Sequence, residues 1–289
     1  MKRFFIFLLF PPWFAFGAPN VVVSIAPVHS LVAFIMQGAG EPHLLLPPTY
    51  SPHTYQLKPS VATLLNQADI VIWLGPELEH ALEKSLKNLA PQAKTLQLTQ
   101  METLTLLPYA NHDHGGIDPH LWLDPQNAKK VAEAIAMLLS AKDPASKKIY
   151  QQNSRILAEK LDALDHELNK FLEPVRELPF LVYHDALQYL NRRYGLKQIG
   201  VVNPNPDMPL KARRVYEISK IAFVKEPLCL FGEPQADQKA IAQLAEELKT
   251  RLAIIDTLGS SIQPGPQLYG QMMQNLARAI QQCLASEGK

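Results

Sequence analysis

Short apolar runs alternate with helical segments along this chain, and this alternation limits the possible folds more than any other feature. Apolar runs rich in β-branched residues occupy residues 20–28 and 70–74 in the first half, and 180–184 and 252–256 in the second. A segment with helical periodicity follows each of them. Continuous apolar strands separated by helices are typical of parallel sheets with helices on both faces. We therefore expect an α/β fold in which each half forms a lobe with a mainly parallel sheet.

A long amphipathic segment separates the two halves. Its apolar residues recur at intervals of four and three, at Leu157, Leu161, Leu164, Leu168 and Phe171. This spacing predicts a helix of roughly 28 residues, about 40 Å long, that ends before Pro174. The helix is too long for an ordinary crossover, so we expect it to link the lobes. The predicted boundaries are an N-terminal lobe at 18–143, a linking helix at 144–173 and a C-terminal lobe at 174–289.

Residues 1–17 have the pattern of a secretory signal peptide. Lys2 and Arg3 precede an apolar run that ends at Phe16, and the small residues Ala15 and Gly17 flank Phe16. We expect cleavage after Gly17. The run is too short, and too interrupted by proline, to span a membrane. Because no cysteine lies near this site, a lipoprotein anchor is not expected, and we predict a soluble protein exported to a Gram-negative periplasm.

The charge balance argues against nucleic acid as a partner. Without Lys2 and Arg3 the 28 basic residues fall to 26 against 27 acidic residues, a net charge of −1. A nucleic-acid-binding protein would need a strongly basic surface. The hydrophobic content of 47 % is sufficient for the cores of two domains of ordinary size.

Two cysteines in an exported chain suggest a disulfide bond. Cys229 lies in an apolar, strand-like run, and Cys283 lies in the last helical segment. We expect a bond between them that attaches the last helix to the second sheet. The alternative is a pair of buried free thiols.

Three histidines occupy similar positions in the expected fold. His53 lies in a loop after a short apolar run, His120 lies between two Asp-Pro pairs, and His184 ends the run 180–184. Asp256 ends another apolar run in the same way. In open α/β sheets, ligands bind at the edge formed by the carboxyl ends of the strands. We therefore expect these four side chains to meet in a cleft between the lobes.

The residue types at these positions favour zinc. Three imidazoles and one carboxylate can form a tetrahedral zinc site, whereas manganese prefers more oxygen ligands. Candidates to orient the rings are Asp185 beside His184, and Asp118 or Asp124 near His120. From the residues alone, purely structural histidines remain an alternative.

Motifs along most of the chain resemble those of the metal-binding receptors of ABC importers for zinc and manganese, the cluster A-I group. The closest likeness is to the zinc-binding members. The motifs are SIAPVHSLV, GAGEPHLLLPP, SPHTYQLKPS, ADIVIWLGPELE, DPHLWLDPQNA, LVYHDALQYLNRRYGL, LFGEPQ and IIDTLGS.

This resemblance implies a non-enzymatic receptor of two α/β lobes joined by a rigid helix. It would capture Zn(II) and deliver it, as a monomer, to an inner-membrane permease driven by an ATPase. The family's ligand motifs here carry His53, His120, His184 and Asp256, and manganese members commonly have Glu in place of His184. The resemblance also implies the disulfide in the second lobe and only a small closing motion.

Two departures from the family pattern affect the predicted site. The His-rich loop before the second ligand is reduced to NHDHGG, in which His112 and His114 are either an accessory metal site or solvated residues. The usual Asp-Pro-Leu-Gly at the fourth ligand here has Thr257 in place of proline. Water, or a nearby acid such as Glu79, is therefore an alternative to Asp256.

Other functions are compatible with the same residues. The cargo could be manganese or iron, or the protein could be a periplasmic zinc chaperone. A zinc hydrolase would keep one coordination position open for water, but its typical His-Glu-x-x-His motif is absent from the sequence.

Overall fold

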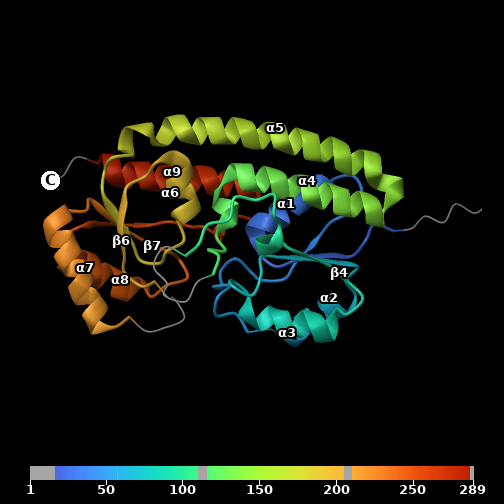
Figure 1. Ribbon diagram of the computed structural model, residues 1–289, viewed down its shortest axis with the longest axis horizontal. Helices are drawn as coiled ribbons and strands as arrows, with labels where there is room; N and C mark the ends of the chain where they lie inside the picture. The colour runs from blue at the N-terminus through green and yellow to red at the C-terminus, as the bar shows by residue number, and fades with distance from the viewer. Residues whose placement is uncertain (1–16, 57, 110–115, 205–209, 287–289) are drawn as a thin grey trace, which may run out of the picture.

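The computed structural model describes residues 17–56, 58–109, 116–204, 210–286, and these form two lobes beneath one long helix, α5 (Figure 1). The predicted signal peptide lies outside these ranges except for Gly17, and so do His112 and His114.

Each lobe contains a four-stranded parallel sheet, as predicted. In the first lobe the strand order is β2-β1-β3-β4, with β1 at Val21–Val23, β2 at His43–Leu44, β3 at Ile70–Trp73 and β4 at Lys94–Gln97. In the second lobe the order is β6-β5-β7-β8, with β5 at Phe180–Val182, β6 at Gln198–Val201, β7 at Cys229–Gly232 and β8 at Arg251–Ile254. The central strands are almost completely buried because helices cover both faces.

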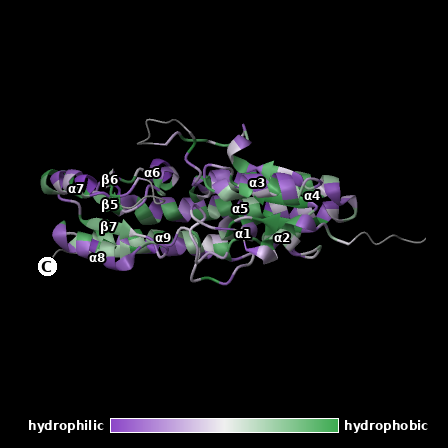
Figure 2. Ribbon diagram, turned by 90° about the horizontal axis from the view of Figure 1, so that it is seen from below, coloured by the Kyte–Doolittle hydropathy of each residue, from purple (hydrophilic) through white to green (hydrophobic). Residues whose placement is uncertain are grey.

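The helices follow the strands in the expected alternation. Their bounds are α1 Ala26–Met36, α2 Pro59–Asn66, α3 His80–Leu89, α4 Pro125–Lys142, α5 Lys147–Leu172, α6 Gln188–Tyr194, α7 Ala212–Lys225, α8 Gln238–Glu247 and α9 Leu268–Ala285. Hydrophobic and hydrophilic stretches alternate along them, as expected for helices with one buried face (Figure 2). In the described part of the chain, none of them combines the length and apolarity that a membrane crossing requires.

The first apolar run is shorter as a strand than the sequence indicated. The strand expected over 20–28 ends at Val23, and α1 begins at Ala26. Pro27 lies in the first turn of α1, where its missing N–H costs no helical hydrogen bond. Periodicity alone could not separate a buried strand from a fully buried helix at this point.

The long helix α5 is close to its predicted length, with 26 residues from Lys147 to Leu172. The predicted leucine stripe is buried, and α5 packs along α4 and α1 in the first lobe and along α9. At its start, Asp143 accepts hydrogen bonds from the Ser146 amide and, at 2.8 Å, from the Tyr150 hydroxyl. These bonds stabilise the reversal between α4 and α5.

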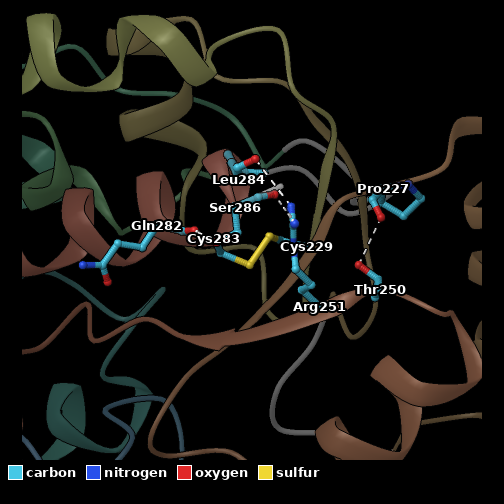
Figure 3. Close-up of a disulfide and its surroundings, with 8 residues drawn as sticks. All are labelled: Pro227, Cys229, Thr250, Arg251, Gln282, Cys283, Leu284 and Ser286. Atoms are coloured by element: carbon cyan, nitrogen blue, oxygen red, sulfur yellow. Dashed lines mark hydrogen bonds between the residues drawn. A yellow bond between two sulfur atoms is a disulfide. The ribbon is translucent and has the colours of Figure 1, made fainter. Parts of the chain in front are cut away.

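The predicted disulfide is present between Cys229 at the start of β7 and Cys283 on α9 (Figure 3). Next to it, Arg251 donates hydrogen bonds to the carbonyls of Leu284 and Ser286. The helix α9 also packs against α1 of the first lobe, so one hydrophobic core extends through both lobes. The disulfide bond therefore attaches the second sheet to α9, the helix that both lobes share.

Candidate metal centre

The three predicted histidines meet between the lobes, at the carboxyl edges of the two sheets. His53 lies in the turn region after β2, His120 immediately precedes the 3-10 turn Leu121–Leu123, and His184 lies two residues after β5. One potential ligand nitrogen from each ring lies within 4.8 Å of the other two. The ring centroids are 4.9 to 5.5 Å apart. This spacing is compatible with one ion bound by all three imidazoles.

His120 is held in place by Asp118. The carboxylate Oδ1 of Asp118 accepts a hydrogen bond from the His120 amide at 2.9 Å and from its ring Nδ1 at 2.7 Å. Both residues are almost fully buried. A carboxylate on Nδ1 fixes the tautomer and leaves Nε2 free to bind metal. Of the two acids suggested by the sequence, Asp118 takes this role, whereas Asp124 caps α4 by accepting from the Gln126 amide.

His184 has the same arrangement with a carboxylate that sequence reasoning missed. Its Nδ1 lies 2.8 Å from Oε2 of Glu233, directly after β7, while the neighbouring Asp185 accepts from the Gln198 side chain instead. Burial alone would lower the pKa of His184, but the Glu233 carboxylate raises it overall. The same contact keeps the pKa of Glu233 low against the effect of burial. The sequence did contain a signal for Glu233, because this residue directly follows an apolar strand-like run. The same kind of position singled out His184 and Asp256.

Among the described residues, no carboxylate is hydrogen-bonded to His53 in this way. Its Nε2 atom is buried and has no hydrogen-bond partner among the described residues. Burial, followed by the proximity of His184 and His120, lowers the pKa of His53 well below its ordinary value. The ring is therefore neutral at neutral pH, and a buried nitrogen lone pair is available to a cation.

Asp256 is engaged by its own loop rather than by the three imidazoles. Its carboxylate accepts hydrogen bonds from the amides of Leu258, Gly259 and Ser261 and from the hydroxyl of Ser260, at 2.8 to 3.3 Å. It is not part of the group of described residues whose ligand atoms lie within 4.8 Å of one another. Its assignment as a ligand remains a prediction.

Glu79, the other acid considered for the fourth position, is also outside this group. It is buried, and its Oε2 accepts hydrogen bonds from the amides of Leu74 at 3.0 Å and Gly75 at 3.1 Å. Burial raises the pKa of Glu79 to about 7. It borders a small cavity together with Pro52, next to His53 in the chain.

A cavity of about 470 Å³ adjoins the three histidines. Residues from both lobes line it, including Thr54 and Trp122 from the first and Tyr183, Gln235 and Leu258 from the second. Three imidazole nitrogens beside an accessible cavity can bind a divalent cation of borderline softness.

The chain is similar in sequence to known zinc-uptake proteins. Residues 21–283 match the family described as ZnuA, zinc-uptake complex component A, periplasmic. The high-affinity zinc uptake system protein ZnuA of Brucella suis biovar 1 (strain 1330) is 35 % identical over 306 residues, covering 92 % of each chain. The protein of the same name from Paracoccus denitrificans (strain Pd 1222) is 32 % identical over 302 residues, covering 93 % of each chain.

Solved structures show the same fold. A zinc-bound deletion mutant of ZnuA superimposes with a TM-score of 0.82 at 25 % identity, covering 94 % of this chain and 100 % of the other. A second ZnuA crystal structure gives a TM-score of 0.80 at 25 % identity, covering 93 % of this chain and 100 % of the other. With a family match over nearly its whole length and two similar lobes around a three-histidine centre, the chain belongs to the ZnuA family of periplasmic zinc-uptake components.

Proposed function

We propose that this protein captures Zn(II) in the cavity between its lobes and delivers it to an ABC importer for zinc uptake. The observation that carries the proposal is the convergence of His53, His120 and His184, with ligand atoms within 4.8 Å of one another. Nitrogen ligands favour zinc over manganese, which prefers oxygen. Membership of a family of uptake components supports a binding role rather than an enzymatic one.

The proposed ligands are the three imidazoles, with Asp256 completing the shell. Asp256 has to exchange at least one of its loop hydrogen bonds for the metal. An anionic carboxylate has enough lone pairs to keep some of these bonds while it binds zinc. Water is the alternative fourth ligand, and would need no such exchange.

The proposed setting is the periplasm, where the family is placed. Residues 1–17 would act as the signal peptide and be removed after Gly17. The proposed partners are an inner-membrane permease and its ATPase, and the proposed receptor is a monomer.

The direct test is a competition titration of the metal-free mature protein, residues 18–289, with zinc and manganese. One tightly bound zinc equivalent and much weaker manganese binding is the expected result. Equal or tighter manganese binding would refute zinc as the cargo. Absence of tight binding for both metals would refute the receptor function itself.

The fourth ligand needs a separate variant. Asp256→Asn removes the negative charge and keeps one side-chain oxygen, which can accept the loop hydrogen bonds made to only one of the two carboxylate oxygens. If Asp256 binds zinc, this variant loses at least about tenfold in zinc affinity, and circular dichroism confirms that it is folded. Unchanged affinity would assign the position to water.

A further inference from the structure

Thr257 connects the two sides of the metal centre. Its carbonyl oxygen accepts a hydrogen bond of 2.9 Å from Nε1 of Trp122, two residues after the ligand His120. Its hydroxyl donates a hydrogen bond of 2.7 Å to Oε1 of Glu233. Thr257 is 3 % exposed, and its bond to Trp122 is buried. One residue of the second lobe thus contacts the ligand-bearing turn of the first lobe and the carboxylate behind His184.

Glu233 uses its two carboxylate oxygens for different partners. Oε2 binds Nδ1 of His184 at 2.8 Å, and Oε1 accepts from the Thr257 hydroxyl. Its side chain also lines the cavity that the three imidazoles border. A carboxylate in this place has two possible roles, because it can orient His184 or turn into the cavity and bind the metal itself.

The Thr257 hydroxyl favours the first role. Turning the Glu233 carboxylate into the cavity would break the bond to Oε1 and leave the buried hydroxyl without this acceptor, at a cost comparable to an unsatisfied buried polar group. The backbone of Thr257 cannot follow the carboxylate, because its carbonyl is held by Trp122 of the other lobe. Glu233 is therefore restrained from two directions.

We propose that Thr257 is a positioning residue that determines metal selectivity: its hydroxyl holds Glu233 against His184 and keeps this carboxylate out of the coordination shell. The inference rests on the proposed zinc-binding function. A shell that gains an oxygen ligand accepts manganese more readily, whereas a nitrogen-rich shell discriminates in favour of zinc. Thr257 thereby contributes to selectivity without contacting the ion.

The test compares Thr257→Val with Thr257→Ser in the mature chain. Valine has nearly the same shape and keeps the carbonyl that accepts from Trp122, but it cannot donate to Glu233. Serine keeps the hydroxyl. The readouts are the ratio of zinc to manganese affinity and the visible absorption spectrum of the Co(II)-substituted protein, whose d–d bands weaken as coordination increases beyond four.

For Thr257→Val we expect the zinc-to-manganese ratio to fall at least about tenfold, the scale on which orienting groups affect metal sites. We expect its Co(II) bands to weaken, while Thr257→Ser behaves as the wild type does. An unchanged ratio and spectrum in a folded Thr257→Val variant would overturn the inference. So would a serine variant that behaves like the valine variant.

A double variant separates the role of Glu233 from a general loosening of the site. In Thr257→Val combined with Glu233→Gln, the carboxylate that could enter the shell is absent, so the ratio should return toward that of Glu233→Gln alone. A further fall in the ratio would overturn the inference and indicate a structural role. A wild-type protein that binds no zinc would refute the proposed function. A zinc-binding wild type whose Thr257 variants behave unlike these expectations would refute only the role of Thr257.

Discussion

At the scale of single residues, the proposed metal centre consists of three rings that are held to different degrees. His120 and His184 each have a carboxylate on Nδ1, from Asp118 and Glu233, whereas no carboxylate among the described residues holds His53 in this way, and its Nε2 is buried without a hydrogen-bond partner there. Two rings are therefore fixed before a metal arrives, which reduces the ordering cost of binding. In the proposed site, the metal would be the partner that Nε2 of His53 lacks among the described residues.

Replacing a ring and replacing its orienting acid should have different effects. His120→Ala removes a ligand and should lower zinc affinity at least about 100-fold, whereas Asp118→Asn should cost about 10–100-fold. His166→Ala, an exposed position on α5, is the matched control and should leave affinity unchanged. Zinc competition measures all three, with circular dichroism to confirm folding. Wild-type affinity in His120→Ala would contradict the site assignment.

The buried Glu79 should make stability depend on pH. Because its pKa rises from 4.5 to about 7 on folding, the folded state binds the proton more tightly than the unfolded state. The contribution of Glu79 is therefore most favourable below about pH 4.5 and declines as pH rises to about 7, by at most about 3 kcal/mol. Glu79→Gln should remove this decline.

Urea unfolding of both proteins at several pH values between these limits measures the effect. The difference in unfolding free energy between Glu79→Gln and the wild type should increase with pH across this range. If the difference in unfolding free energy stays constant with pH, the pKa of Glu79 is not raised by burial.

At the scale of elements, α9 and the strands it covers are joined covalently. The disulfide bond between Cys229 and Cys283 closes a loop, because the two cysteines are 54 positions apart in the sequence. Such a bond restricts the unfolded chain and attaches α9, which also packs against α1 and α5. It lies at the start of β7, at the opposite end of the strand from Glu233.

Replacing both cysteines by serine should therefore lower the free energy of unfolding by about 2–4 kcal/mol, as measured in urea. Zinc affinity under native conditions should remain that of the wild type, because the metal centre is at the other end of the strand. The reduced wild type is the matched control. A large loss of zinc affinity in a folded variant would show that the bond also shapes the site.

At the scale of the whole molecule, buried hydrogen bonds join the lobes beside the metal centre. The Tyr189 hydroxyl on α6 accepts from the Leu107 amide at 3.0 Å and donates to the Asp118 carbonyl at 2.8 Å. The Tyr269 hydroxyl on α9 donates to the Trp122 carbonyl at 2.7 Å. Together with the shared core and α5, these bonds favour a rigid molecule and only a small change on metal binding.

Removing one interlobe hydroxyl should have a measurable effect on the free energy of unfolding. Tyr189→Phe leaves the buried Leu107 N–H without its acceptor and should lower the free energy of unfolding by about 1–3 kcal/mol. Tyr216→Phe, on the exposed face of α7, is the control and should have almost no effect. Equal stability of both variants would argue against the interlobe bond.

Rigidity can also be measured on the intact protein. Small-angle X-ray scattering of the metal-free and zinc-bound forms should give the same radius of gyration within error. A clear decrease on adding zinc would show that the lobes close as separate bodies, despite their common core.

The sequence by itself determined the α/β class, the linking helix, the disulfide pair and the three histidines. These features depend on local periodicity, or on residue types at the ends of apolar runs. It placed the end of the first strand incorrectly, because a buried strand and a buried helix show the same unbroken apolar pattern. Only the tertiary structure decided that Glu233 rather than Asp185 orients His184, and that the oxygens of Asp256 are engaged by its own loop. The reason is that His184 and Glu233 lie 49 positions apart and meet only because β5 and β7 are neighbours in the sheet.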